Sequence, residues 1–80
     1  MTVTVRLFAY YAERVGRTEW SLELPEGSTV SDVVASVTAL PGGSVLPDSP
    51  LAAVNQSYAT SSTRLADGDE VAIIPPVAGG

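Results

Sequence analysis

A chain of 80 residues, 45% of them hydrophobic, is long enough for one small domain with its own core. It contains no cysteine and no histidine, which excludes disulfides and cysteine- or histidine-based nucleophiles, and we expect no metal site. Lysine is absent, and the chain has four arginines and nine acidic residues. The resulting net charge of −5 argues against nucleic acids and anionic membranes as partners and favours proteins with a basic surface.

The first quarter of the chain predicts a hairpin with a short helical connection. Residues 2–8 alternate between two faces, which predicts a strand with Phe8 on the face opposite the valines. Residues 10–15 predict about one helical turn that Gly16 ends. Residues 18–24 alternate again and predict the second strand. The residues expected on the inner faces of the two strands are Val3, Val5, Leu7, Trp20, Leu22 and Leu24.

The next segment predicts the main helix. Thr29 is a typical N-cap residue, and Asp32 follows three positions later in an approximate capping box. Apolar residues then recur at the spacing of a helix that lies on a sheet. These residues are Val30, Val33, Val34 and Val37. The Pro-Gly-Gly-Ser segment of residues 41–44 ends the helix and begins a loop that we expect to run to Pro50.

The last third predicts three strands. Residues 51–54 and 57–59 form short strands joined by a tight turn at residues 55–56. Residues 67–69, Asp-Gly-Asp, form another turn before residues 70–74, the most continuously apolar strand. A run of this kind is typical of a central strand that is buried on both faces.

The order β-β-α-β-β-β predicts an α+β protein with a β-grasp, or ubiquitin-like, fold. We expect a mixed sheet of about five strands with one main helix packed across it. Pro75 and Pro76 cannot donate hydrogen bonds to a sheet, so the last strand must stop before them. Residues 1–76 therefore form the predicted domain, and residues 77–80 form a flexible diglycine tail.

The tail is thin enough to enter another protein's active site. Glycine has no Cβ, so Gly79 and Gly80 fit constrictions that are closed to other residues. Four residues beyond Pro76 reach about 13 Å, enough to enter a pocket while the domain stays outside. A carboxylate at Gly80 is a poor electrophile, and because the chain has no cysteine, histidine or lysine, the catalytic groups must come from partner proteins.

Three motifs together resemble the small, sulfur-carrying subunit of molybdopterin synthase, in the ubiquitin-like family that also contains the sulfur carrier of thiamine synthesis. The motifs are LAAVNQ at residues 51–56, LADGDEVA at 65–72 and PPVAGG at 75–80. Segments 5–9 and 13–16 are similar to the family less specifically, and residues 36–50 match nothing characteristic.

The resemblance implies a carrier that acts as part of molybdopterin synthase and is not an enzyme by itself. In this family an activating enzyme, an adenylyltransferase of the ubiquitin-activating type that uses ATP and Mg²⁺, adenylates the terminal carboxylate. A sulfur donor protein converts the adenylate to a thiocarboxylate. The large subunit of molybdopterin synthase then takes up the tail, and the sulfur passes to cyclic pyranopterin monophosphate in molybdenum cofactor biosynthesis. The family's assembly is a heterotetramer, and the chain itself binds no cofactor.

The resemblance and the residue pattern assign site residues to two groups. Gly80 is the residue that becomes the acyl-adenylate and then the thiocarboxylate, and it enters the partner with the rest of the tail. The other tail-insertion residues are Gly79, Ala78 and Val77. Candidates for the partner interface are Phe8, Ile74, Pro75 and Pro76.

Three other functions fit parts of the sequence. The first is the sulfur carrier of thiamine biosynthesis, which ends in the same diglycine but is usually shorter. The second is a ubiquitin-like protein modifier, and the third is a binding module whose tail is never activated. The N-terminus lacks the layout of a signal peptide and no apolar run spans a membrane, so we expect a cytoplasmic protein.

Overall fold

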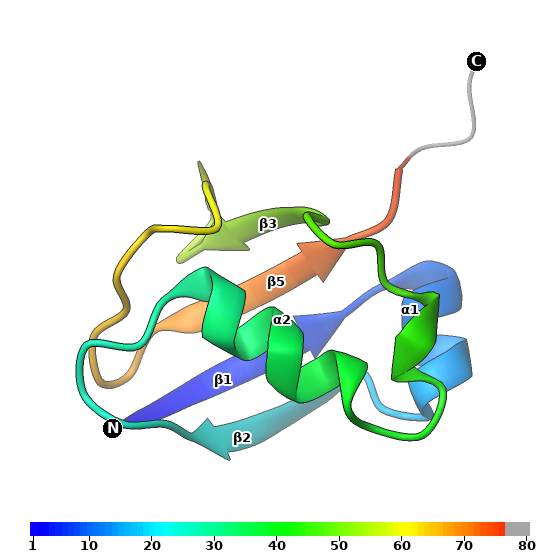
Figure 1. Cartoon of the computed structure of the whole chain (residues 1–80), viewed down its shortest axis with the longest axis horizontal. Coiled ribbons are helices and arrows are strands. Elements are labelled where there is room, and N and C mark those ends of the chain that lie inside the picture. Colours follow the sequence, from blue (N-terminus) through cyan, green and yellow to red (C-terminus); the bar gives the residue numbers. More distant parts are fainter. Residues whose placement is uncertain (77–80) are drawn as a thin grey trace.

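The computed structural model describes residues 1–76, which form a five-stranded mixed sheet crossed on one face by helix α2, Val30–Thr38 (Figure 1). The strand order is β2-β1-β5-β3-β4. The strands are β1 (Thr2–Leu7), β2 (Glu19–Glu23), β3 (Leu51–Val54), β4 (Ser57–Ala59) and β5 (Glu70–Ile74). Helix α1, Ala9–Val15, and the 3₁₀ turn η1, Gly43–Val45, contact each other at one end of the sheet. Within residues 1–76, neither α-helix has the length and apolar character required to cross a membrane.

Strand β5 occupies the centre of the sheet, as its apolar run predicts. It pairs in parallel with β1 and antiparallel with β3. Val71, Ala72 and Ile73 are all buried, so both faces of the strand are covered along its middle. The predicted α+β class with a central last strand is confirmed.

The core lies between the sheet and the valine stripe of α2. All four valines of the stripe are buried, as predicted. At the start of the helix, Oδ2 of Asp32 accepts a hydrogen bond of 2.8 Å from the backbone N–H of Thr29, and the capping box is present. The largest fully buried side chains of the sheet and α1 are Val3, Val5, Tyr11, Val71 and Ile73.

The elements differ from the prediction mainly at their ends. Strand β1 stops at Leu7, and Phe8 serves as the N-cap of α1 with extended backbone angles. Ala9 has φ of +49°, which turns the chain into the helix directly after Phe8 and ends the strand there. The expected loop of residues 41–50 also contains η1, because Gly42 and Gly43 fold back against α1 and α2.

Both predicted turns are confirmed. Asn55 and Gln56 have positive φ angles of 49° and 71°, the pattern of a type I′ hairpin turn. At the second turn, Gly68 takes φ of +88°. Beside it, Oδ1 of Asp67 accepts the Thr2 N–H at 2.7 Å, and the Asp69 carboxylate accepts the Ala66 N–H at 2.7 Å. Asp67 therefore ties the turn to β1, and Asp69 closes the turn itself.

Replacing Gly43 with alanine is expected to destabilise the domain by about 2–3 kcal/mol. A Cβ at this buried position would lie 1.9 Å from the backbone oxygen of Val37 and 2.9 Å from that of Thr38. The backbone of α2 cannot move away without disturbing the valine stripe. Denaturant unfolding of the variant and of the parent chain measures the difference.

The matched control is Gly27→Ala. Gly27 has φ of +85°, but a Cβ there would meet nothing within 4 Å. This variant should be destabilised by only about 1–2 kcal/mol, the backbone strain of an alanine in a left-handed conformation. Equal stability of Gly43→Ala and the parent chain would show that η1 does not pack tightly against α2.

Candidate functional site

The central strand leads the chain directly to the predicted reactive segment. Strand β5 ends at Ile74, Pro75 is buried and Pro76 is exposed at the edge of the described residues (Figure 1). The prolines end the hydrogen-bond ladder, as predicted. The four predicted tail residues lie outside the described residues, so their roles and the division at residue 76 stay predictions. They are Val77, Ala78, Gly79 and Gly80.

The face of the sheet opposite α2, here called the open face, carries an apolar patch next to this exit. The register places Leu51 directly opposite Ile74 on β5. Tyr58 on β4 lies opposite Ala53, which in turn lies opposite Ala72. Residues opposite each other in a sheet point to the same face. Leu51 is 47% exposed and Tyr58 77% exposed, which is unusual for large apolar side chains in so small a domain.

Phe8 completes the patch from the other side of β5. It follows Leu7, which pairs with Ile73, so it reaches the same end of the sheet as Ile74. Its ring lies beside the guanidinium of Arg6, whose neighbours Val5 and Leu7 point into the core. We define the open-face patch as four apolar residues of the open face, three of them at the end of β5 and the fourth two strands away on β4, in the row of Ala53 and Ala72. They are Phe8, Leu51, Tyr58 and Ile74.

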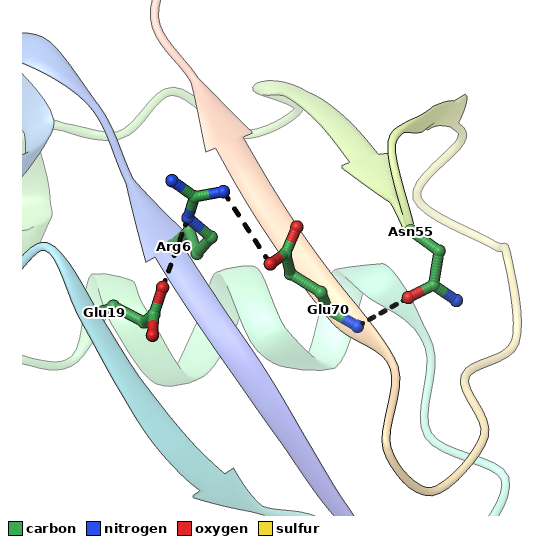
Figure 2. A network of polar contacts seen from close by, with 4 residues as sticks. All are labelled: Arg6, Glu19, Asn55 and Glu70. Atoms are coloured by element: carbon green, nitrogen blue, oxygen red, sulfur yellow. Dashed lines mark hydrogen bonds and ion pairs between the residues drawn. The ribbon is translucent and has the colours of Figure 1, made fainter.

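A polar network covers the middle of the open face beside this patch. Nε of Arg6 lies 3.4 Å from Glu19, and its Nη1 lies 3.7 Å from Glu70. The backbone N–H of Glu70 donates a 3.0 Å hydrogen bond to Oδ1 of Asn55 (Figure 2). Figure 2 shows that these side chains project from the sheet on the side away from α2. The charged group next to the apolar patch is therefore the Arg6 guanidinium, paired with two carboxylates.

The arrangement on the open face is suited to binding a partner. The sequence supplies no cysteine, histidine or lysine that could act as an activated nucleophile. Within residues 1–76, no group of three or more acidic side chains is arranged to hold a metal ion. Exposed apolar side chains bordered by charge are instead typical of a protein interface.

The other features with unusual chemistry lie away from this patch. A groove of about 380 Å³ lies between α2 and residues 46–48, with Ala35, Thr38 and Asp48 among its lining residues. Burial raises the pKa of the Tyr11 hydroxyl above its ordinary value, with a further contribution from the neighbouring Tyr10. Tyr11 belongs to the core and takes no part in the open face.

The chain as a whole matches a family of proteins from residue 5 to residue 80, the region that contains all the motifs described above. The family is the ThiS family. The chain belongs to it.

Relatives of this ThiS-family chain share a single description. The molybdopterin synthase sulfur carrier subunit of Chlamydomonas reinhardtii is 37% identical over 83 residues, and the match covers 100% of both chains. The corresponding subunit of Arabidopsis thaliana is 34% identical, over 98% of this chain and 82% of the relative. The resemblance seen in the motifs is therefore confirmed at the level of the whole chain.

Solved structures confirm the ubiquitin-like β-grasp fold of this ThiS-family chain. SAMP1 from Haloferax volcanii superposes with a TM-score of 0.84 at 26% identity, over 100% of both chains. A Pyrococcus furiosus protein assigned as subunit 1 of molybdopterin converting factor gives a TM-score of 0.80 at 28% identity, over 96% of this chain and 99% of that one. In a Helicobacter pylori complex of subunits 1 and 2 of the same factor, a chain with a TM-score of 0.73 and 23% identity has the same fold, and the match covers 100% of both chains.

The structure of this ThiS-family chain shows where the four predicted interface residues lie and adds two further candidates, Leu51 and Tyr58. Phe8 and Ile74 are half-buried, Pro76 is exposed and Pro75 is buried, so Pro75 offers little surface to a partner. Their role in an interface stays a prediction. Leu51 and Tyr58 were missed by the sequence analysis. The sequence of β3 and β4 shows no clear alternation, and it is the register of β3 with β5 and of β4 with β3 that places these two residues on the open face.

Proposed function

We propose that this chain is the sulfur carrier subunit of a molybdopterin synthase, with the Gly80 carboxylate as the group that carries sulfur. The observation that carries the proposal is the geometry of strand β5. This central strand ends at Ile74, at the same end of the sheet as Phe8 and Leu51 of the open-face patch, so a partner bound there lies beside Pro75 and Pro76. The names of the full-length relatives support the assignment.

The proposed chemistry changes only the terminal carboxylate. A carboxylate oxygen of Gly80 attacks the α-phosphorus of ATP on an activating enzyme, pyrophosphate leaves, and an acyl-adenylate forms. Hydrosulfide from a sulfur donor protein then attacks the carbonyl carbon, AMP leaves, and the product is a thiocarboxylate. ATP and Mg²⁺ are bound by the activating enzyme, and this chain needs no cofactor of its own.

In the second stage the large subunit of the synthase receives the tail. The thiocarboxylate sulfur attacks a carbon of cyclic pyranopterin monophosphate and displaces an oxygen substituent of that carbon, which leaves as water or with the phosphate. Water then hydrolyses the acyl–sulfur bond to Gly80, which restores the carboxylate and leaves the sulfur on the pterin. The open-face patch binds the large subunit, and the solved complex of subunits 1 and 2 of a related factor supports a pairing of this kind. The net charge of −5 favours a basic surface on the partner.

Formation of the thiocarboxylate tests the first stage directly. The chain is incubated with the adenylating enzyme of its own organism, ATP, Mg²⁺ and a hydrosulfide source, and its intact mass is measured. We expect a mass increase that corresponds to replacement of one oxygen by sulfur, located at Gly80 by fragmentation and absent without ATP. If the enzyme forms an adenylate with a different carrier of the host and none with this chain, the proposal is wrong.

A ubiquitin-like modifier is the second candidate function. It is favoured by the similarity to SAMP1, a protein named as a small archaeal modifier. The same acyl-adenylate would then be attacked by a lysine amine of a target protein. This chain has no lysine and cannot itself accept a second copy at a lysine side chain. Mass spectrometry of host proteins for lysines that carry the Gly80 end of this chain distinguishes this function from sulfur transfer. Sulfur transfer on thiazole synthase would instead indicate a role in the thiamine pathway. For all three functions we propose the cytoplasm as the location.

A further inference from the structure

Phe8 holds an unusual position in the open-face patch because the core does not fix its ring. Its backbone is extended, with φ of −127° and ψ of 156°, and Ala9 at φ of +49° turns the chain away immediately afterwards. Within residues 1–76, the hydrophobic core and the side chains packed against it do not include Phe8. The orientation of this ring must therefore depend on a contact outside the core.

The guanidinium of Arg6 supplies that contact. Its central carbon lies 5.1 Å from the centroid of the Phe8 ring, within the range of a cation–π interaction. Arg6 and Phe8 are two residues apart on the same side of the chain, so the two side chains lie next to each other on the open face.

Neighbouring strands hold the guanidinium from both sides. Arg6 pairs with Glu19 of β2 in the strand register, and Nε lies 3.4 Å from that carboxylate. On the other side, Nη1 lies 3.7 Å from Glu70 of β5. The backbone N–H of Glu70 donates a hydrogen bond to Oδ1 of Asn55, at the turn between β3 and β4, which holds this end of β5 against that turn (Figure 2).

We infer that Arg6 is a positioning residue that holds the Phe8 ring in the orientation required for docking of the partner. The inference rests on the proposed function, because the partner is the large subunit of molybdopterin synthase. The physical advantage is entropic: a ring already ordered in the free chain loses less freedom when the partner covers it. Glu19 and Glu70 contribute indirectly, because their carboxylates form ion pairs with the Arg6 guanidinium.

The role of Arg6 is separable from folding. Its side chain is 40% exposed, and exposed ion pairs contribute little to stability. An Arg6→Met variant keeps most of the apolar stem and loses the charge, so its melting temperature should stay close to that of the parent chain. Its affinity for the large subunit should fall by about two- to fivefold, the size of an exposed cation–π contact.

The test is a double-mutant cycle on the dissociation constant for the large subunit of the same organism, measured by calorimetry. We expect Arg6→Met to weaken binding in the parent chain and to have no effect in a Phe8→Leu background, which lacks the aromatic face. The matched control is Arg17→Met. Arg17 lies 5.3 Å from the ring of Trp20, and Trp20 pairs with Val5, which points to the core side of the sheet. This control has the same loss of charge and should leave the affinity unchanged.

A second measurement reads the orientation of Phe8 without any partner. Three-bond NMR couplings report the χ1 rotamers of Phe8 in the free chain, and we expect one dominant rotamer in the parent chain and averaging in Arg6→Met. Equal weakening by Arg6→Met in both backgrounds, or an unchanged Phe8 rotamer, would overturn the inference. If the parent chain does not bind the large subunit, the proposed function fails, and the rotamer measurement still decides whether Arg6 orders the ring.

Discussion

We expect removal of Gly80 to abolish sulfur transfer to cyclic pyranopterin monophosphate while the melting temperature stays nearly unchanged. The loss is complete because the terminal carboxylate then lies on Gly79, one residue short of the position where the partner's reacting groups meet it. Stability is retained because every member of the core cluster lies between Val3 and Ile73. Thermal unfolding and molybdopterin formation with the purified large subunit measure the two quantities.

The truncated chain should still bind the large subunit through the open-face patch. Added in excess, it should therefore inhibit transfer from the full-length thiocarboxylated chain. This competition is the control that separates a chemical defect from a binding defect. Transfer of sulfur by the truncated chain at a rate near that of the full chain would rule out Gly80 as the carrier group.

The second large effect is expected at Leu51. A Leu51→Glu substitution should weaken binding of the large subunit by about 3 kcal/mol, or roughly a hundredfold, because it places a charge in a surface that the partner desolvates. Leu51 is 47% exposed in the free chain, so the carboxylate remains hydrated there and the fold should tolerate it. Calorimetry of the complex and circular dichroism of the free variant test both parts.

Ala35→Glu provides the matched control on the opposite face. Ala35 is exposed on α2, beside the groove formed with residues 46–48, and the change adds the same negative charge. It should leave the affinity for the large subunit within about twofold, since exposed charges far from an interface act only through screened interactions. Equal weakening by both substitutions would show that net charge, and not the open-face patch, controls binding.

Much of the fold could be predicted because local signals and packing agree. The stripe from Val30 to Val37 has helical spacing, and the capping box of Thr29 and Asp32 marks where that helix begins. The apolar run of β5 has the composition of a strand covered on both sides, which identified the centre of the sheet. Asn55 and Gln56 adopt the positive φ angles of the tight turn predicted there.

The features that sequence alone did not reveal depend on contacts between distant segments. Gly42 and Gly43 lie in a segment without a recognisable motif, and only their close approach to the backbones of α1 and α2 explains the 3₁₀ turn. The sequence does not show which face of the sheet Tyr58 lies on; the register of β3, β4 and β5 places it on the open face. The position of Arg6 between Glu19 and Glu70 likewise follows from the order of the strands, which brings β2 and β5 to either side of β1.

The most direct test of the account is an affinity purification from the native host, with this chain as bait and mass spectrometry to identify what it binds. We predict recovery of the molybdopterin synthase large subunit, reduced when the bait is the Leu51→Glu variant. Recovery of thiazole synthase instead, or of proteins joined to this chain through their lysines, would retain the β-grasp fold and contradict the proposed role in molybdopterin synthesis.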